Sequence, residues 1–210
     1  MAITLHYFDL YARGEVTRMI MHYQGAAFTD HRITFEEWPA LRESGFSEFS
    51  ELPVLEIDGL RLVQSHSINR YLCQKFGLLP ASPIEEYYAE SLCDLKEDIY
   101  RHFAQLTFAK DHEAIEKEMN ESMPIWLKMI EKRLEKNKQG DGWFVGENVT
   151  IADFEVFQLV HDYIIREGPS EKYAHLVDTN APKLKAWATR LVESSQTLKS
   201  YLAARGNCFF

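Results

Sequence analysis

Cysteine is scarce in this sequence and is not placed for metal or redox chemistry. The three cysteines, Cys73, Cys93 and Cys208, are odd in number and far apart, and no Cys-x-x-Cys occurs. This pattern favours reduced structural thiols over a disulfide framework or a zinc site. It also argues against thiol–disulfide exchange by the protein itself. We therefore expect no metal and no catalytic cysteine.

Long hydrophobic runs are also missing. No apolar run approaches the ~18 residues that a membrane span requires. Met1–Thr4 leads directly into a strand pattern, without a basic region or a cleavage site. The sequence therefore predicts an intracellular protein of the cytoplasm that does not associate with membranes.

Basic residues are outnumbered by acidic ones. Lys and Arg total 23 against 32 Asp and Glu, which gives a net charge of −9. This charge argues against nucleic acid and anionic membrane surfaces as partners. An anionic ligand must then be attracted by local basic side chains and helix ends. The 210 residues, 46% of them hydrophobic, allow one or two domains with a sizeable core.

The most informative stretch is a hairpin signal near position 58. Asp58-Gly59 separates two short apolar runs, Val54–Ile57 and Leu60–Val63. Asp-Gly suits a tight hairpin turn, because both central positions require positive φ. Pro53 precedes the first run, where a proline can begin a strand and an X-Pro bond can be cis.

A helical pattern begins directly after the hairpin, with Ser65 as its expected N-cap. The N-terminus of a helix has free backbone N–H groups and favours a carboxylate. The unit from Leu52 to Phe76 is therefore predicted to hold an anionic ligand. A plain strand–turn–strand–helix without a ligand remains the alternative.

The residues before the hairpin alternate between strand and helix patterns. They comprise a strand over Ile3–Phe8, a loop over Asp9–Arg13, a helix from about Gly14, a strand over Phe28–Ile33 and a short helix or turn over Glu36–Arg42. Together with the hairpin and its helix, the order is β-α-β-α-β-β-α. This order predicts one α/β layer structure whose last two strands are antiparallel.

The remainder of the chain is almost wholly helical. Gly77 and two prolines indicate a linker, placed at residues 79–83, so that domains are expected over residues 1–78 and 84–210. Helices are predicted over Glu85–Lys110, over His112–Asn137, from Thr150, from Pro182 and near Thr197–Arg205. Pro124 should bend the second of these helices. Thr150 and Asp153 form a capping box at the start of the third.

Several of these motifs together resemble the cytosolic glutathione transferases. They are Tyr7-Phe8, Arg13-x-Glu15, Trp38-Pro39, Leu52-Pro53, Asp58-Gly59, Gln64-Ser65, Asp98 and Val149–Asp153. The pattern of Asp30–Ile33, Trp38-Pro39 and Glu56–Gly59 is most similar to the sigma class. The resemblance covers essentially the whole chain. It implies a thioredoxin-like α/β N-terminal domain followed by an all-α C-terminal domain, the glutathione transferase fold.

The resemblance also implies an activity. The protein would add glutathione, its co-substrate, to small hydrophobic electrophiles, which is a detoxification reaction. Tyr7 would donate a hydrogen bond to the sulfur of glutathione and favour the thiolate. Arg13 would either polarise the region beside this thiolate or form a structural ion pair with Glu15.

A set of glutathione-binding residues follows from the same resemblance. They are Tyr7, Trp38, Arg42, Glu51, Leu52, Pro53, Gln64, Ser65 and Asp98. The backbone of Leu52 would pair with the cysteinyl unit of the tripeptide, and Gln64 and Ser65 would hold its γ-glutamyl carboxylate. Trp38 and Arg42 would face its glycine end.

The resemblance further implies a homodimer. Asp98 would reach the γ-glutamyl amine of glutathione bound by the neighbouring subunit. Phe49 falls where related classes insert an aromatic key into a socket on the partner. The electrophile would lie on an apolar wall formed by Leu10, Tyr11, Tyr100, Phe103, Phe108 and Phe210.

Two positions depart from the family pattern, and two other functions stay open. Arg42 replaces the usual lysine and preserves pairing with a carboxylate. Glu51 replaces a glutamine, lysine or asparagine, and its charge should repel the glycine carboxylate. The alternatives to a transferase are a glutathione-dependent isomerase of prostaglandin endoperoxides and a non-catalytic relative that serves as a crystallin or stores ligands.

Overall fold

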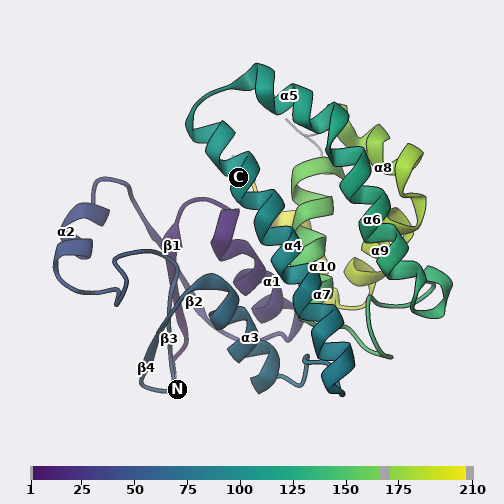
Figure 1. Ribbon diagram of the computed structural model, residues 1–210. Coiled ribbons are helices and arrows are strands. Elements are labelled where there is room, and N and C mark those ends of the chain that lie inside the picture. The colour runs from purple at the N-terminus through teal and green to yellow at the C-terminus, as the bar shows by residue number, and fades with distance from the viewer. Residues whose placement is uncertain (1, 166–170, 207–210) are drawn as a thin grey trace. The chain divides into compact units, whose positions relative to one another are not determined.

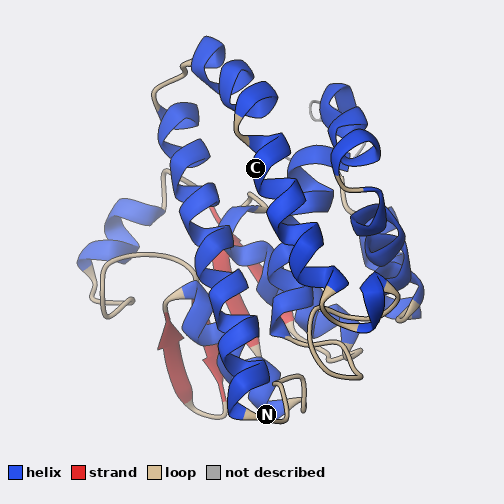
Figure 2. Ribbon diagram, turned by 45° about the vertical axis from the view of Figure 1, so that its right-hand side comes forward, coloured by secondary structure: helices blue, strands red, loops and turns tan. Residues whose placement is uncertain are grey.

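The computed structural model describes residues 2–165 and 171–206 of the chain. Their internal contacts divide them into two compact units. The first contains Met1–Gly77 and Ser195–Phe210, and the second contains Leu78–Ser194. Among the described residues, all strands lie in the first unit, and the second is built of helices and loops (Figure 2).

The first unit is an α/β layer around a four-stranded sheet. Its elements are β1 (Thr4–Phe8), α1 (Glu15–Tyr23), β2 (Thr29–Ile33), α2 (Trp38–Glu43), β3 (Val54–Ile57), β4 (Leu60–Val63), α3 (Ser65–Lys75) and α10 (Gln196–Ala204). The sheet order is β2-β1-β3-β4, with β1 parallel to β2, and β3 antiparallel to β1 and β4. α1 and α3 lie on one side of the sheet and α2 on the other (Figure 1). The predicted order and the antiparallel final pair are confirmed.

The side chains of β1 alternate between the two faces of the sheet. Leu5 and Tyr7 are buried, at 0% and 5% exposure, on the face that carries α1. The ring of Tyr7 packs against Gly14, where an added Cβ would come within 2.5 Å of a ring carbon. A side chain at position 14 would therefore displace the phenol.

The hairpin forms as its turn signal predicts. Asp58 and Gly59 have φ values of 53° and 78°. Lys75 on α3 donates to the Asp58 carboxylate at 2.6 Å and ties the turn to the end of that helix. The prediction of Ser65 as N-cap is wrong, because Gln64 occupies the cap position and Ser65 is the first helical residue.

The last helix, α10, packs against α1. The sequence placed residues 84–210 in one helical domain, whereas the internal contacts group Ser195–Phe210 with the first unit. Leu198 of α10 is fully buried, and the hydroxyl of Ser195 donates to the carbonyl oxygen of Tyr23 at the end of α1. The sequence alone could not predict these contacts, because the residues that they join lie near opposite ends of the chain.

Within its described residues, the second unit contains two short 3-10 helices (Lys138–Gly140 and Glu171–Tyr173) and seven longer helical segments. The longer segments are α4 (Pro83–Phe108), α5 (His112–Glu121), α6 (Met123–Glu135), α7 (Ile151–Phe157), a π-helical segment (Gln158–Ile165), α8 (Ala174–Asn180) and α9 (Pro182–Glu193). No helix among the described residues is long and apolar enough to cross a membrane.

One helix prediction in this unit is wrong. Instead of a single helix over His112–Asn137 that bends at Pro124, α5 ends at Glu121 and α6 begins at Met123. Pro124 lies in the first turn of α6. Backbone N–H groups there have no acceptor within the helix, so a proline costs no helical hydrogen bond. The proline therefore starts a new helix.

The predicted capping box at the start of α7 is confirmed. Asp153, which is fully buried, accepts hydrogen bonds from the backbone N–H and the hydroxyl of Thr150. Its other oxygen accepts from the N–H of Phe144 and from the indole of Trp187. Asp153 therefore fixes the start of α7 and also joins it to α9 in the core of this unit.

A row of polar side chains crosses the other face of the sheet. His6 Nδ1 lies 2.9 Å from Nδ1 of His31, and His6 Nε2 lies 3.1 Å from Glu56 Oε2. Arg61 donates to the second oxygen of Glu56 at 2.9 Å. Burial lowers the pKa of His6 below its usual value, and this effect exceeds the opposing effect of Glu56.

Acidification should therefore destabilise the first unit through His6. A neutral His6 stabilises the fold above the ordinary pKa of about 6.5, and this contribution is lost as the pH falls through the lower pKa of the folded state. Urea titrations at about pH 7.5 and about pH 5.5 should show a smaller loss of unfolding free energy for His6→Gln than for the wild type. The matched variant His112→Gln, at an exposed position on α5, should keep the wild-type loss. An equal loss for His6→Gln would contradict the prediction.

Candidate functional site

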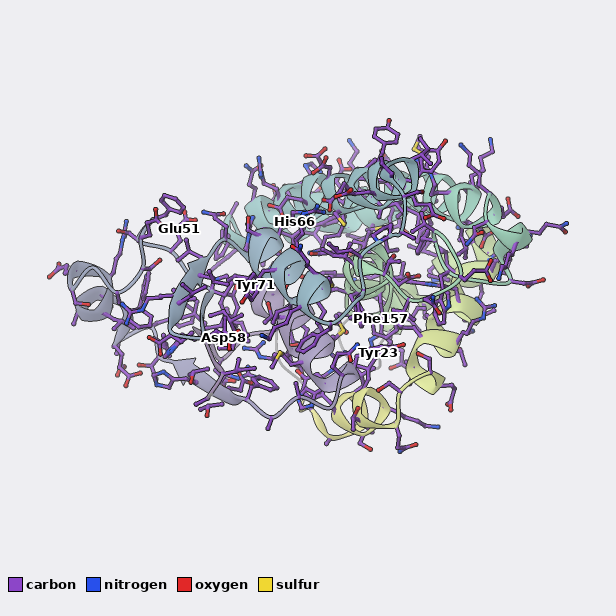
Figure 3. The ribbon with its side chains drawn as sticks, turned by 90° about the horizontal axis from the view of Figure 1, so that it is seen from below. Tyr23, Glu51, Asp58, His66, Tyr71 and Phe157 are labelled. Carbon is purple, nitrogen blue, oxygen red and sulfur yellow. The ribbon has the colours of Figure 1, made fainter. Side chains whose placement is uncertain are left out.

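One cavity in the first unit collects residues from three stretches of the chain. Its lining residues are Arg13, Phe49, Glu51, Leu52, Pro53, Val63, Gln64 and Ser65. They come from the loop before α1, the loop that leads to the cis Leu52–Pro53 bond, and the junction of β4 with α3. The structure thus brings Arg13 together with the ligand residues predicted at positions 51–53 and 64–65. Glu51 lies at the opposite end of β3 from Asp58 (Figure 3).

The junction of β4 with α3 has the features of an anion site. Gln64 has φ 70° and ψ 111°, and such backbone values in a residue other than glycine often occur at ligand sites. No side chain caps α3. The side chains of Gln64 and Ser65 make no hydrogen bond with the described residues. The helix N-terminus therefore offers N–H groups, a hydroxyl and an amide to a carboxylate.

Tyr7 stands at the end of β1 with its oxygen close to Arg13. The backbone N–H of Arg13 donates to the Tyr7 hydroxyl oxygen at 3.2 Å. A hydroxyl that accepts a hydrogen bond becomes a stronger donor itself. The guanidinium of Arg18 lies 5.7 Å from the centre of the Tyr7 ring and adds a cation there. The phenol is thus prepared to donate to an anion.

A buried ion cluster holds the segment between Tyr7 and α1. Arg18 is fully buried and pairs with Glu15 at 3.2 Å and with Asp30 at 3.0 Å. It also donates to the carbonyl oxygen of Leu10 at 2.8 Å. Burial opposes the charge of Arg18, but Glu15 and Asp30 outweigh it and raise the pKa of the guanidinium. Arg18 therefore remains a cation that fixes the loop.

The sequence reasoning missed this cluster. Arg18 lies on the apolar face of α1. This placement could have predicted an ion pair, because a buried charge requires a partner of opposite charge. Tyr201 and Arg205 also bind Glu15, and no sequence motif near them predicts this contact. They lie 186 and 190 residues beyond Glu15 in the sequence.

Other predicted site residues lie outside the cavity lining. Trp38 and Arg42 are on α2, where Trp38 is half-buried against the ring of Phe8 and Arg42 is exposed. Arg42 makes no ion pair with the described residues. Leu10 and Tyr11 lie in the loop after β1, in the first unit.

The remaining predicted residues belong to the second unit or lie outside the described residues. Asp98, Tyr100, Phe103 and Phe108 are all on α4. Asp98 is exposed, and Phe108 is 87% exposed at the end of the helix. Phe210 lies outside the described residues. The electrophile wall therefore stays a prediction.

Comparison with known proteins identifies relatives along the whole chain. Residues 97–205 match the family described as glutathione S-transferase, C-terminal domain. A glutathione S-transferase from Plasmodium falciparum (isolate 3D7) is 32% identical over 97% of this chain and 96% of its own length. The solved structure of monomeric Na-GST-3, a glutathione S-transferase from Necator americanus, has a TM-score of 0.84 at 28% identity and covers 100% of both chains.

Two further relatives bear names of other functions. S-crystallin SL11 of Nototodarus sloanii is 29% identical over 99% of this chain and 98% of its own length. Hematopoietic prostaglandin D synthase of Gallus gallus is 33% identical over 71% of this chain and 73% of its own length. The chain is therefore similar to proteins of more than one named function.

Proposed function

Because this chain belongs to the glutathione S-transferase family, we propose that the cavity of its first unit binds glutathione and that Tyr7 holds the sulfur as a thiolate. The chain is a transferase that uses glutathione as a substrate. The assignment of this site rests on one observation, namely that Arg13, Gln64 and Ser65 line the same cavity. The Tyr7 hydroxyl lies next to the backbone of Arg13.

The free energy that Tyr7 must contribute to stabilise the thiolate is modest. A free thiol with a pKa of about 8.5 is only a few per cent thiolate at neutral pH. Lowering this pKa by about two units requires ~2.7 kcal/mol of preferential stabilisation of the thiolate. One charge-assisted hydrogen bond in a partly dry site, about 1.5–3 kcal/mol, is of that size. The bond from Arg13 to the phenol oxygen supports this role, because it strengthens the phenol as a donor.

The tripeptide would lie extended through the cavity. The uncapped N-terminus of α3, with Gln64 and Ser65, would hold the γ-glutamyl carboxylate. The backbone of Leu52 would pair with the cysteinyl unit. Trp38 and Arg42 would face the glycine end. Arg13, which lines the cavity, would supply positive charge beside the sulfur.

The second substrate is proposed to be a small hydrophobic electrophile. With a chloronitroaromatic, the thiolate sulfur forms a bond to the carbon that bears chlorine. Chloride then leaves with its bonding electron pair. Positioning and electrostatic stabilisation of the thiolate supply the catalysis.

Two assays test this proposal together. The protein should be retained on immobilised glutathione, be eluted by free glutathione, and convert the chloronitroaromatic with release of chloride. Retention without conversion of this or other electrophiles would favour a non-catalytic relative that serves as a crystallin or stores ligands, and the chain is similar to an S-crystallin of Nototodarus sloanii. Absence of both would overturn the proposed site.

A second candidate is isomerisation of prostaglandin endoperoxides. It is favoured by the similarity to the prostaglandin D synthase of Gallus gallus, and the cation of Arg13 is compatible with it. A product assay with the endoperoxide and glutathione decides between the two. The sigma-class assignment from the sequence pattern also remains a prediction.

We propose a homodimer in which Asp98 completes the site of the neighbouring subunit. Asp98 is exposed on α4 and makes no ion pair with the described residues. Phe49 is 55% exposed beside the cavity, as expected of an aromatic key at an interface. Sedimentation should give the mass of two chains, whereas a single chain would exclude a role of Asp98 across an interface.

The proposed cellular location is the cytoplasm. Cys73 and Cys93 are buried and are not joined by a disulfide, which suits a reducing compartment.

Substitution Glu51→Gln should lower KM for glutathione. Glu51 lines the cavity, and its carboxylate makes no ion pair with the described residues. Its repulsion of an anionic ligand at an exposed position is worth about 0.5–1 kcal/mol, or about two- to fivefold in KM. The effect should diminish at high salt. Glu48→Gln, an equal charge change in the same loop away from the cavity lining, is the control. A rise in KM for Glu51→Gln would contradict this prediction.

A further inference from the structure

We propose that Arg205 and Tyr201 at the C-terminal end of the chain position the Tyr7 loop (residues 8–15) for catalysis by binding Glu15. This inference rests on the proposed role of Tyr7. It assigns to the end of the chain a function in the glutathione site of the first unit. Arg205 and Tyr201 are positioning residues, because they act through Glu15.

Glu15 is placed to transmit movement to the phenol. It is the first residue of α1 and follows Arg13 and Gly14 directly. Gly14 packs so closely on the Tyr7 ring that an added Cβ would lie 2.5 Å from a ring carbon. Arg13 donates its N–H to the Tyr7 oxygen. A shift of Glu15 would therefore change these two contacts of Tyr7.

Two residues near the C-terminal end bind Glu15. Glu15 is fully buried, accepts a hydrogen bond from the Tyr201 hydroxyl at 2.8 Å and forms an ion pair with Arg205. The side chain of Arg205 is only 4% exposed. Burial and the charge of Glu15 raise the pKa of Tyr201, so its hydroxyl remains a donor.

Arg205 gives Glu15 a cation in addition to Arg18. Arg18 is shared between Glu15 and Asp30. Asp30 has a second cation, Arg32, at 2.7 Å. Removal of Arg205 would take one cation away from the fully buried Glu15. A buried carboxylate in that state is costly, and it would move toward water or take up a proton.

Further contacts bring the C-terminal end to the same loop. Tyr11, within the Tyr7 loop, donates its hydroxyl to the carbonyl oxygen of Gly206. The guanidinium of Arg205 lies 4.8 Å from the centre of the Tyr11 ring. Tyr201 stacks on His22 of α1 at 4.0 Å between ring centres. The end of the chain thus binds both the loop and the helix that follows it.

The test is the pH profile of kcat/KM for Arg205→Ala. A displaced Tyr7 loop should raise the apparent pKa of bound glutathione by ~1 unit. Well below that pKa the thiolate fraction then falls about tenfold and kcat/KM about threefold, because a thiolate of higher pKa is also more nucleophilic. KM for glutathione should change little, because the junction of β4 with α3 is untouched. Arg205→Lys should recover part of the loss, and Tyr201→Phe should give a smaller shift. Lys199→Ala, an exposed position on α10, is the control with the same charge change.

A second readout separates this inference from the proposed function. The ¹³Cζ resonance of Tyr7, identified by its loss in Tyr7→Phe, should shift in Arg205→Ala and not in Lys199→Ala. This readout requires no turnover, so it still reports positioning if the wild type forms no thiolate. If Arg205→Ala lowers only the thermal stability, and both the Tyr7 resonance and the pH profile stay unchanged, Arg205 is merely structural and the inference is overturned.

Discussion

Substitution Tyr7→Phe is expected to raise the apparent pKa of glutathione on the enzyme from about 6.5 to about 8.5. At about pH 6.5 the thiolate fraction then falls about 50-fold. Turnover should fall less, about tenfold, because a thiolate of higher pKa is also more nucleophilic. The fold and KM for glutathione should be retained, since the ring still packs on Gly14 and the other proposed ligand residues are unchanged.

The pH profile makes this prediction specific. Above about pH 9 both enzymes would hold mostly thiolate, so the deficit of the variant should shrink or vanish there. Ultraviolet absorption of the bound thiolate gives an independent reading of the same pKa. Tyr71→Phe, which removes a hydroxyl on α3 that contacts Asp58, should behave as the wild type. Unchanged kinetics in Tyr7→Phe would remove Tyr7 from the mechanism.

The hairpin unit could be predicted because its signals are local. Asp58-Gly59 fixes the turn, and Pro53 marks the start of β3. The apolar runs on either side set the pairing of β3 with β4. The cap of α3 was misassigned because Gln64 adopts a positive φ that its residue type does not indicate. That backbone value is set by the fold around it.

The proposed glutathione site could be predicted only in part. The residues at positions 51–53 and 64–65, which line one cavity, were predicted because each lies within a short motif. The cluster around Glu15 could not be predicted, because Arg205 lies 190 residues from Glu15 in the sequence. A partner that distant in sequence leaves no spacing to detect. The position of the Tyr7 loop therefore depends on tertiary structure.

Substitution Asp153→Ala should cause the largest loss of stability in the second unit. It would leave the backbone N–H groups of Thr150 and Phe144 and the indole N–H of Trp187 without their acceptor. Each orphaned buried donor costs about 1–3 kcal/mol, so a loss of about 3–5 kcal/mol is expected. Since a typical domain is stable by only about 5–15 kcal/mol, the variant should unfold near physiological temperature.

Asp153→Ala is tested by urea denaturation beside Asp111→Ala. Asp111 also caps a helix, by accepting from the N–H of Ala114, but it is exposed. Its removal should cost only about 1 kcal/mol. If Asp153→Ala cost no more than that, the buried hydrogen bonds would not hold the start of α7.

The pH dependence of Asp153→Asn then separates charge from hydrogen bonding. Burial raises the pKa of Asp153 to about 6, although the hydrogen bonds from Thr150, Trp187 and Phe144 favour the ionised form. Because the folded pKa lies above the unfolded value, the protonated group stabilises the fold fully at low pH, and this contribution is lost as the pH rises through about 6. The stability advantage of the wild type over Asp153→Asn should therefore narrow between about pH 5 and about pH 7.5. An advantage that widens over this range would mean that the donors outweigh burial and that the ionised carboxylate is what holds α7 to α9.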